Sequence, residues 1–77
     1  MNKQWIMVDS SNLEAINYTA SAEDPAIGEL HIKFRQKGQH YVFYGVPVDV
    51  YNEMLVADSI GKFFHSNVKG NYKYEVL

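Results

Sequence analysis

The spacing of hydrophobic residues changes once along the chain, at Pro47, and this change constrains the fold more than any other feature. Before Pro47, apolar and polar residues alternate strictly over residues 30–35, which is typical of a strand with one buried face. After it, apolar residues recur at helical spacing over 50–55 and again over 60–68. This order predicts an α+β domain: a three- to four-stranded antiparallel β-meander followed by two short helices packed on one face.

The expected strands are bounded by residues that favour turns and loops. We expect a first strand over residues 13–19, a loop over 20–28, a second strand over 30–35 and a returning strand over 40–44. Residues 72–76 alternate again, and form either a short edge strand or an ordered tail.

The helical half of the chain carries start and stop signals. Pro47 suits the first turn of a helix, because its ring fixes φ and its missing N–H would be unpaired there. Either Asp58 or Ser59 can cap the second helix, and Gly70 ends it. The two apolar stripes consist of Val50, Tyr51, Met54 and Leu55, and of Ile60, Phe63, Phe64 and Val68.

The turn of the expected hairpin allows two registers. A two-residue turn at residues 37–38 would place Tyr41 on the core face, but it requires positive φ at a residue with a Cβ. A three-residue loop over 36–38 requires positive φ only at its glycine, and it places Tyr41 opposite Lys33 and Phe43 on the same basic face. The glycine argument favours the three-residue loop, and a slip of one residue would exchange the two faces.

Length and composition exclude several classes of protein. The chain has 77 residues, no cysteine and a formal net charge of −2, which indicates one domain without disulfides, thiol catalysis or cysteine-ligated zinc. Its pI of about 5.8 argues against coating nucleic acid by bulk charge. The apolar run over residues 5–8 is too short for a signal peptide, and no stretch has the length of a membrane span. We therefore expect a cytoplasmic protein with no membrane partner.

Several short motifs follow one another in a distinctive order. They are Ser10-Ser11-Asn12-Leu13, Ile16-x-Tyr18, Tyr41-Val42-Phe43-Tyr44-Gly45-Val46-Pro47, Val50-Tyr51, Leu55, Ala57, Ser59-x-Gly61-x-Phe63-Phe64, Val68, Tyr72 and Tyr74. In order and spacing this set resembles the KTSC domain, over roughly residues 10–76. The resemblance identifies residues 1–77 as a single KTSC-like domain, in which residues 1–9 are an N-terminal extension or an edge strand.

The resemblance also carries expectations about function. The KTSC domain is named from the carboxy-terminus of some lysyl-tRNA synthetases and also occurs as a small stand-alone protein in bacteria and their phages. It implies an accessory domain for which RNA binding is the usual suggestion, and no enzyme activity. This chain departs from the family pattern in three places: a central Tyr-x-Tyr is here Tyr41-x-Phe43, the hairpin is one residue longer, and the loop before Leu30 is extended.

The residues that could support catalysis are isolated from one another in the sequence. His31, His40 and His65 have no HExxH motif around them, and the chain contains neither GxSxG nor a phosphate-binding glycine loop. His31 and His40 can approach one another across the hairpin, but metal ligands usually have close spacing or a carboxylate partner. We therefore expect a protein that is not an enzyme, with no catalytic residues, no metal and no cofactor.

Basic residues are concentrated in two aromatic-rich stretches. Six of the seven lie within 31–44 and 60–74, and neither stretch contains an acid. Cations that neutralise phosphates, interleaved with rings that stack on bases, are typical of proteins that bind single-stranded RNA. The candidate RNA-binding residues are Lys33, Arg35, Tyr41, Tyr44, Lys62 and Lys69. The competing interpretation assigns Phe63 and Phe64 to the core and treats the basic residues as a solvated surface.

A protein partner is the alternative hypothesis. Tyr, Trp, Met and Arg are enriched in interface hot spots, and the candidate contacts are Trp5, Met7, Arg35, Tyr41 and Tyr44. In this interpretation the chain is an interaction module, such as a phage-encoded inhibitor that binds a host or defence protein. The strip of residues 5–7 either packs as an additional edge strand or contacts a partner or a second copy, and packing is favoured because an open strip would promote aggregation.

Overall fold

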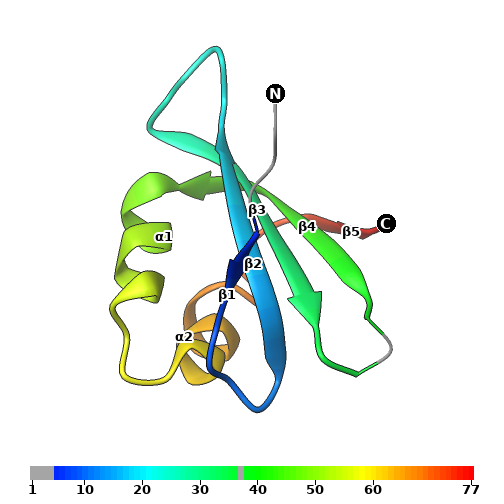
Figure 1. The fold of residues 1–77 in the computed structure, drawn as a ribbon. Coiled ribbons are helices and arrows are strands. Elements are labelled where there is room, and N and C mark those ends of the chain that lie inside the picture. Colours follow the sequence, from blue (N-terminus) through cyan, green and yellow to red (C-terminus); the bar gives the residue numbers. More distant parts are fainter. Residues whose placement is uncertain (1–4, 37) are drawn as a thin grey trace.

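The computed structural model describes residues 5–36 and 38–77, which form one antiparallel sheet with two helices (Figure 1). The elements are β1 (Ile6–Met7), β2 (Leu13–Ala20), β3 (Ile27–Phe34), β4 (His40–Pro47), α1 (Val48–Leu55), α2 (Ile60–Asn67) and β5 (Tyr74–Val76). The sheet has five strands in the order β1-β2-β3-β4-β5, so each strand pairs with its neighbours in sequence. The predicted α+β class is confirmed. The sheet is larger than the expected three to four strands, because both ends of the chain contribute a short edge strand.

The two helices pack on the same face of the sheet, which we call the helix-side face. On α1, the Tyr51 ring stacks on Tyr18 of β2 with centroids 4.8 Å apart, and the Tyr18 hydroxyl donates to the Val46 carbonyl oxygen at 2.7 Å. On α2, Phe64 is 1% exposed and meets Phe43 of β4 edge-on. The fully buried core beneath them includes Leu13, Ile16, Leu30, Ile32, Val46, Met54 and Val68. No helix in the described part of the chain is long and apolar enough to cross a membrane.

The helix boundaries follow the predicted signals closely. Pro47 has extended backbone angles, so it is the last residue of β4 and the N-cap of α1 rather than a member of its first turn. Ser59, not Asp58, caps α2, and its hydroxyl oxygen accepts from the Lys62 backbone N–H at 3.2 Å. Gly70 has φ of 86°, which allows the chain to turn away after the helix.

The register of the β3–β4 hairpin differs from both predicted registers. Tyr41 lies opposite Ile32, and Phe43 lies opposite Leu30, so both rings belong to the helix-side face and not to the face of Lys33. The favoured three-residue loop was therefore wrong. A longer loop forms because the Phe34 N–H closes the hairpin on the Gln39 carbonyl oxygen, at 2.9 Å. Lys37, within the loop, lies outside the described residues.

The N-terminal strip packs as an edge strand, which was the favoured interpretation. Ile6 pairs with Ile16, and Met7 pairs with Ala15. The Trp5 ring meets the ring of His40 edge-on, with centroids 5.0 Å apart, on the face of the sheet away from the helices. Met7 remains 68% exposed, because β1 is an edge strand of the described sheet and pairs with β2 alone.

Candidate functional site

The helix-side face contains an open groove between α2 and the strands β4 and β5. It encloses about 330 Å³. We call it the aromatic groove, and its lining residues are Phe34, Tyr41, Phe43, Phe64, His65, Lys69, Gly70 and Tyr74. Most of these side chains are aromatic, and none carries a negative charge.

The rings of the aromatic groove form an ordered surface. Tyr41 is nearly parallel to Tyr74, with centroids 5.5 Å apart and an interplanar angle of 23°, and nearly parallel to Phe43, at 6.3 Å and 18°. Beneath them, Phe64 meets Phe34 and Phe43 edge-on at 5.7 Å and 5.4 Å. Because Phe64 is fully buried, it holds this surface in place, while Tyr74 stays 55% exposed.

A second hollow continues the groove toward the hairpin loop. It encloses about 240 Å³ and shares Phe34, Tyr41, His65 and Lys69 with the aromatic groove. Its further lining residues all carry side-chain amides, and we call them the amide end: Asn12, Gln36 and Gln39. Among the described residues that line the two hollows, Lys69 is the only Lys or Arg, and there is no Asp or Glu.

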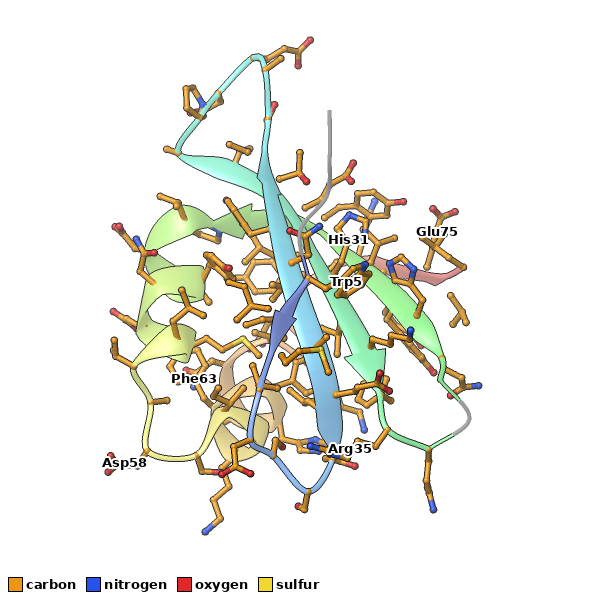
Figure 2. All side chains as sticks on the ribbon, viewed as in Figure 1. Trp5, His31, Arg35, Asp58, Phe63 and Glu75 are labelled. Atoms are coloured by element: carbon orange, nitrogen blue, oxygen red, sulfur yellow. The ribbon has the colours of Figure 1, made fainter. Side chains whose placement is uncertain are left out.

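Three polar side chains on the opposite face of the sheet are hydrogen-bonded to one another. Nε2 of His31 lies 3.2 Å from Oε1 of Glu29, and Nδ1 of His31 lies 2.8 Å from Nε2 of His40. A carboxylate can only accept, so Nε2 of His31 donates to Glu29. His31 is 2% exposed, and the Trp5 ring packs against both imidazoles, as Figure 2 shows for Trp5 and His31. These contacts connect β3 with β4 beneath Trp5.

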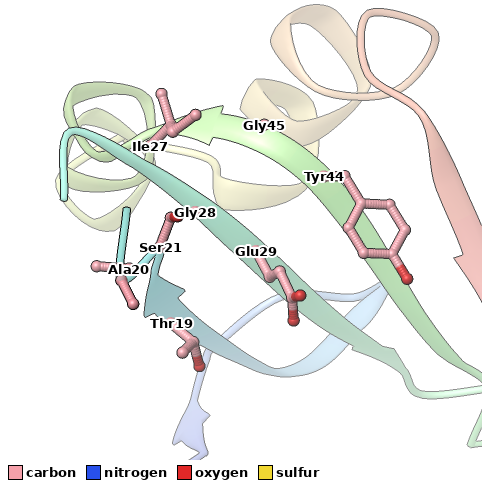
Figure 3. Close-up of a pocket in the computed structure, with 9 residues that line it drawn as sticks. Thr19, Ala20, Ser21, Ile27, Gly28, Glu29, Tyr44 and Gly45 are labelled. Atoms are coloured by element: carbon pink, nitrogen blue, oxygen red, sulfur yellow. The ribbon is translucent and has the colours of Figure 1, made fainter. Parts of the chain in front are cut away.

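Tyr44 also lies on the opposite face, where it donates to Oε1 of Glu75 on β5. This hydrogen bond to a carboxylate raises the pKa of the Tyr44 hydroxyl, with burial as a smaller cause. Tyr44 and Glu29 line an open hollow of about 400 Å³, which lies where β4 bulges, with Tyr44 and Gly45 opposite Glu29 of β3 (Figure 3). Although this hollow is larger than the aromatic groove, its Tyr44 hydroxyl and Glu29 carboxylate are already bonded to Glu75 and His31.

The structure separates the six predicted RNA-binding residues. Only Tyr41 and Lys69 meet, in the aromatic groove. Lys33 lies opposite His40 in the hairpin ladder, and Lys62 is exposed in the first turn of α2. The structure does not join the basic residues to Tyr41 on one hairpin face, because the observed register places Tyr41 opposite Ile32, away from the face of Lys33.

The Arg35 side chain makes two hydrogen bonds within the fold. Its Nε donates to the Ser10 carbonyl oxygen at 2.6 Å, and its Nη2 donates to the Val8 carbonyl oxygen at 3.4 Å. The guanidinium therefore fastens the segment between β1 and β2 to the hairpin. The residues predicted for a protein partner do not form one surface either, because Trp5 packs on the opposite face whereas Tyr41 lies in the aromatic groove.

Sequence reasoning missed most of the groove. Tyr74 was noted only as one of the aromatic residues in a basic stretch, and the amide end was not noted at all. The usable signal is the alternation of Tyr72 and Tyr74 next to Lys69, which is typical of an edge strand with one aromatic face. The amides of Asn12 and Gln39 are far apart in sequence, so only the fold brings them together.

Known proteins share the sequence pattern and the fold of this chain. The family model of the KTSC domain matches residues 9–72. The chain belongs to the KTSC domain family. Over 70 residues it is 36% identical to a protein of Tsukamurella paurometabola, and this match covers 91% of the chain and 96% of that protein.

Two further matches show where such sequences occur. The crystal structure of a KTSC domain protein from Yersinia pestis matches with a TM-score of 0.83 and 32% identity, covering 99% of each chain. A lysine–tRNA ligase of Nostoc is 37% identical over 54 residues, which are 70% of this chain but only 9% of the ligase. KTSC sequences are therefore found both as most of a small protein and as a small part of a much longer one.

Proposed function

We propose that this KTSC domain is a binding module that holds single-stranded RNA in the aromatic groove. The observation that carries the proposal is the nearly parallel pair of Tyr41 and Tyr74 beside Lys69, in a groove without a carboxylate among its described lining residues. Flat rings accept the faces of bases, and a nearby ammonium neutralises the phosphate that joins them.

The rings supply most of the expected binding energy. Base–aromatic stacking contributes roughly 1–3 kcal/mol per base. Tyr74 is the most exposed of the parallel rings, and Tyr41 beside it is half-buried, so these two rings offer the stacking positions. Because Phe64 already holds the surface in place, little side-chain ordering is needed when RNA binds.

The electrostatic contribution is expected to be small. Lys69 is the only Lys or Arg among the described residues that line the groove. Each phosphate contact to a single strand gives a slope of about −0.7 in a plot of log affinity against log salt concentration. We therefore expect a shallow salt dependence, with a slope near that of one contact.

The relatives support RNA over other partners. A stretch similar to most of this chain is part of a lysine–tRNA ligase, whose name states tRNA as a substrate. A protein partner is the competing outcome, and it requires the same face to bind without any RNA.

Fluorescence anisotropy with a labelled, unstructured single-stranded RNA of about eight nucleotides, within the usual range of site sizes, tests the proposal. We expect binding at low salt, a loss of about tenfold in affinity for Tyr74→Ala, and a slope reduced by about 0.7 for Lys69→Gln. No binding at low salt would overturn the proposal, as would binding that both substitutions leave unchanged.

Matched substitutions on the opposite face are the controls. Lys33→Gln removes the same charge as Lys69→Gln, and Tyr44→Ala removes the same side chain as Tyr74→Ala. Because the Tyr44 hydroxyl bonds to Glu75, Tyr44→Ala also weakens the attachment of β5. A loss of affinity common to Tyr44→Ala and Tyr74→Ala would therefore indicate loosening of β5, whereas a loss confined to Tyr74→Ala indicates stacking in the groove.

A further inference from the structure

The amide end gives the groove a second property, which rests on the proposed function. We infer that Asn12, together with Gln36 and Gln39, reads the edge of the base that stacks at Tyr41, and that it selects adenine. The amides line the hollow into which the edge of such a base would extend, and Tyr41 lines both that hollow and the aromatic groove.

Hydrogen bonds of the backbone fix the positions of two of these amides. The carbonyl oxygen of Asn12 accepts from the Arg35 N–H at 3.1 Å, and the Asn12 N–H donates to the Ser10 hydroxyl at 3.2 Å. The carbonyl oxygen of Gln39 accepts from the Phe34 N–H at 2.9 Å, which closes the hairpin. The side chains of Asn12 and Gln39 therefore extend from ordered positions on two neighbouring loops.

His65 orients the Asn12 amide. Nδ2 of Asn12 lies 3.1 Å from Nε2 of His65. An amide nitrogen can only donate, so Nε2 of His65 accepts and its proton is on Nδ1. This contact uses one hydrogen of Nδ2 and leaves the second hydrogen, together with Oδ1, for a ligand. Asn12 thus presents a donor and an acceptor side by side.

This donor–acceptor pair matches adenine better than guanine. Adenine offers an amino donor next to a ring-nitrogen acceptor, and Asn and Gln pair with it through two hydrogen bonds. Guanine presents two acceptors, O6 and N7, on the corresponding edge, so Oδ1 of Asn12 would have no donor to accept from there. A purine also covers more of the Tyr41 ring than a pyrimidine does. His65 is a positioning residue in this scheme, because it acts through Asn12.

The test compares oligouridines of about eight nucleotides, within the usual range of site sizes, that differ only in one central nucleotide: uridine, adenosine, cytidine or guanosine. We expect the adenosine form to bind about tenfold more tightly than the others. Asn12→Ala should reduce this preference severalfold, and His65→Phe should reduce it partly. Asn52→Ala, which removes an exposed amide on α1, should leave the preference intact.

The outcomes separate this inference from the proposed function. Equal binding of all four RNAs by the unmodified protein would overturn adenine selection but not RNA binding. An adenosine preference that persists when Asn12, Gln36 and Gln39 are all replaced by Ala would also overturn it. Failure of every RNA to bind at low salt would overturn both. Circular dichroism of each variant identifies any loss of preference that comes from unfolding.

Discussion

On the helix-side face of the sheet, Tyr41 lies nearly parallel to both Phe43 and Tyr74 along an open groove, with Lys69 on its wall. On the opposite face, Glu29, His31 and His40 are hydrogen-bonded to one another. The two faces of one five-stranded sheet therefore use aromatic and charged side chains in different ways. One face has rings and amides along an open groove, and the other has hydrogen bonds that connect neighbouring strands.

The place of a basic residue in the sequence does not show which contacts its side chain makes in the fold. Arg35 carries the charge that a phosphate would need, yet its guanidinium donates to two backbone carbonyls. The groove has fewer charges but more accessible rings. We conclude that shape and stacking, rather than charge density, define the face that binds in our proposal.

The largest expected effect comes from removing the ring that supports the groove. Phe64→Ala deletes a side chain that is 1% exposed and touches Phe34 and Phe43, and such deletions cost about 3–5 kcal/mol of folding free energy. Phe63→Ala, at a half-buried neighbouring position, should cost less. Urea unfolding measures both. Equal losses for the two variants would contradict the special role of Phe64 beneath the groove.

The next largest effect should distinguish the two faces directly. His31→Ala removes a buried ring with hydrogen-bonding partners on both nitrogens, which we expect to cost about 2 kcal/mol of folding free energy. Its effect on the RNA affinity of the folded fraction should be negligible, because the groove lies on the other face. Lys33→Ala, on the same face, should change the unfolding free energy by less than about 0.5 kcal/mol. A weakened RNA affinity in folded His31→Ala would show that the two faces are coupled.

The smallest expected effect is a shift in the pKa of three tyrosine hydroxyls, which alkaline titration measures. The three pKa values are raised for different reasons. Burial raises the pKa of Tyr18, with the charge of Asp24 adding to it, and burial alone raises the pKa of Tyr51. The pKa of these hydroxyls is higher in the folded state than the unfolded value of about 10. Their contribution to the free energy of unfolding is therefore fully present below about pH 10. This stability is lost as pH rises through the folded pKa values.

Tyr44 should titrate differently, because its bond to Glu75 is the main cause of its raised pKa. Glu75→Gln should therefore lower the pKa of Tyr44 toward its ordinary value and leave those of Tyr18 and Tyr51 in place. Absorbance of tyrosinate in single Tyr→Phe variants measures each hydroxyl. If Glu75→Gln left the pKa of Tyr44 unchanged, this would contradict the hydrogen bond between Tyr44 of β4 and Glu75 of β5.

Much of the fold could be predicted from local chemistry, and the exceptions have a common cause. The stripe containing Phe64, the cap at Ser59 and the turn after Gly70 depend on residues close in sequence, and the structure confirms them. The hairpin register depends on Arg35, whose backbone N–H bonds to Asn12 and whose side chain bonds to Ser10. Because of these contacts β3 ends before Arg35, and the hairpin loop is longer than predicted. The residues of the turn itself do not indicate that Arg35 bonds to residues so distant in sequence.

The candidate site was predictable only in part for the same reason. A register error of one residue exchanges the faces of a strand, so it moved Tyr41 from the groove to the basic face. Lys69 was identified correctly as a neighbour of aromatic residues, but its partner Tyr74 belongs to an edge strand that the sequence left undecided. The amide end needed the fold, because Asn12 and Gln39 come from different loops.

The most direct test of the account is an NMR titration that follows the tyrosine ring protons as single-stranded RNA is added. Bases that stack on a ring shift its protons upfield, so the account predicts upfield shifts for Tyr41 and Tyr74, which line the aromatic groove. The protons of Tyr44, on the opposite face, should remain in place. Shifts at Tyr44 with Tyr41 and Tyr74 unchanged would contradict the account.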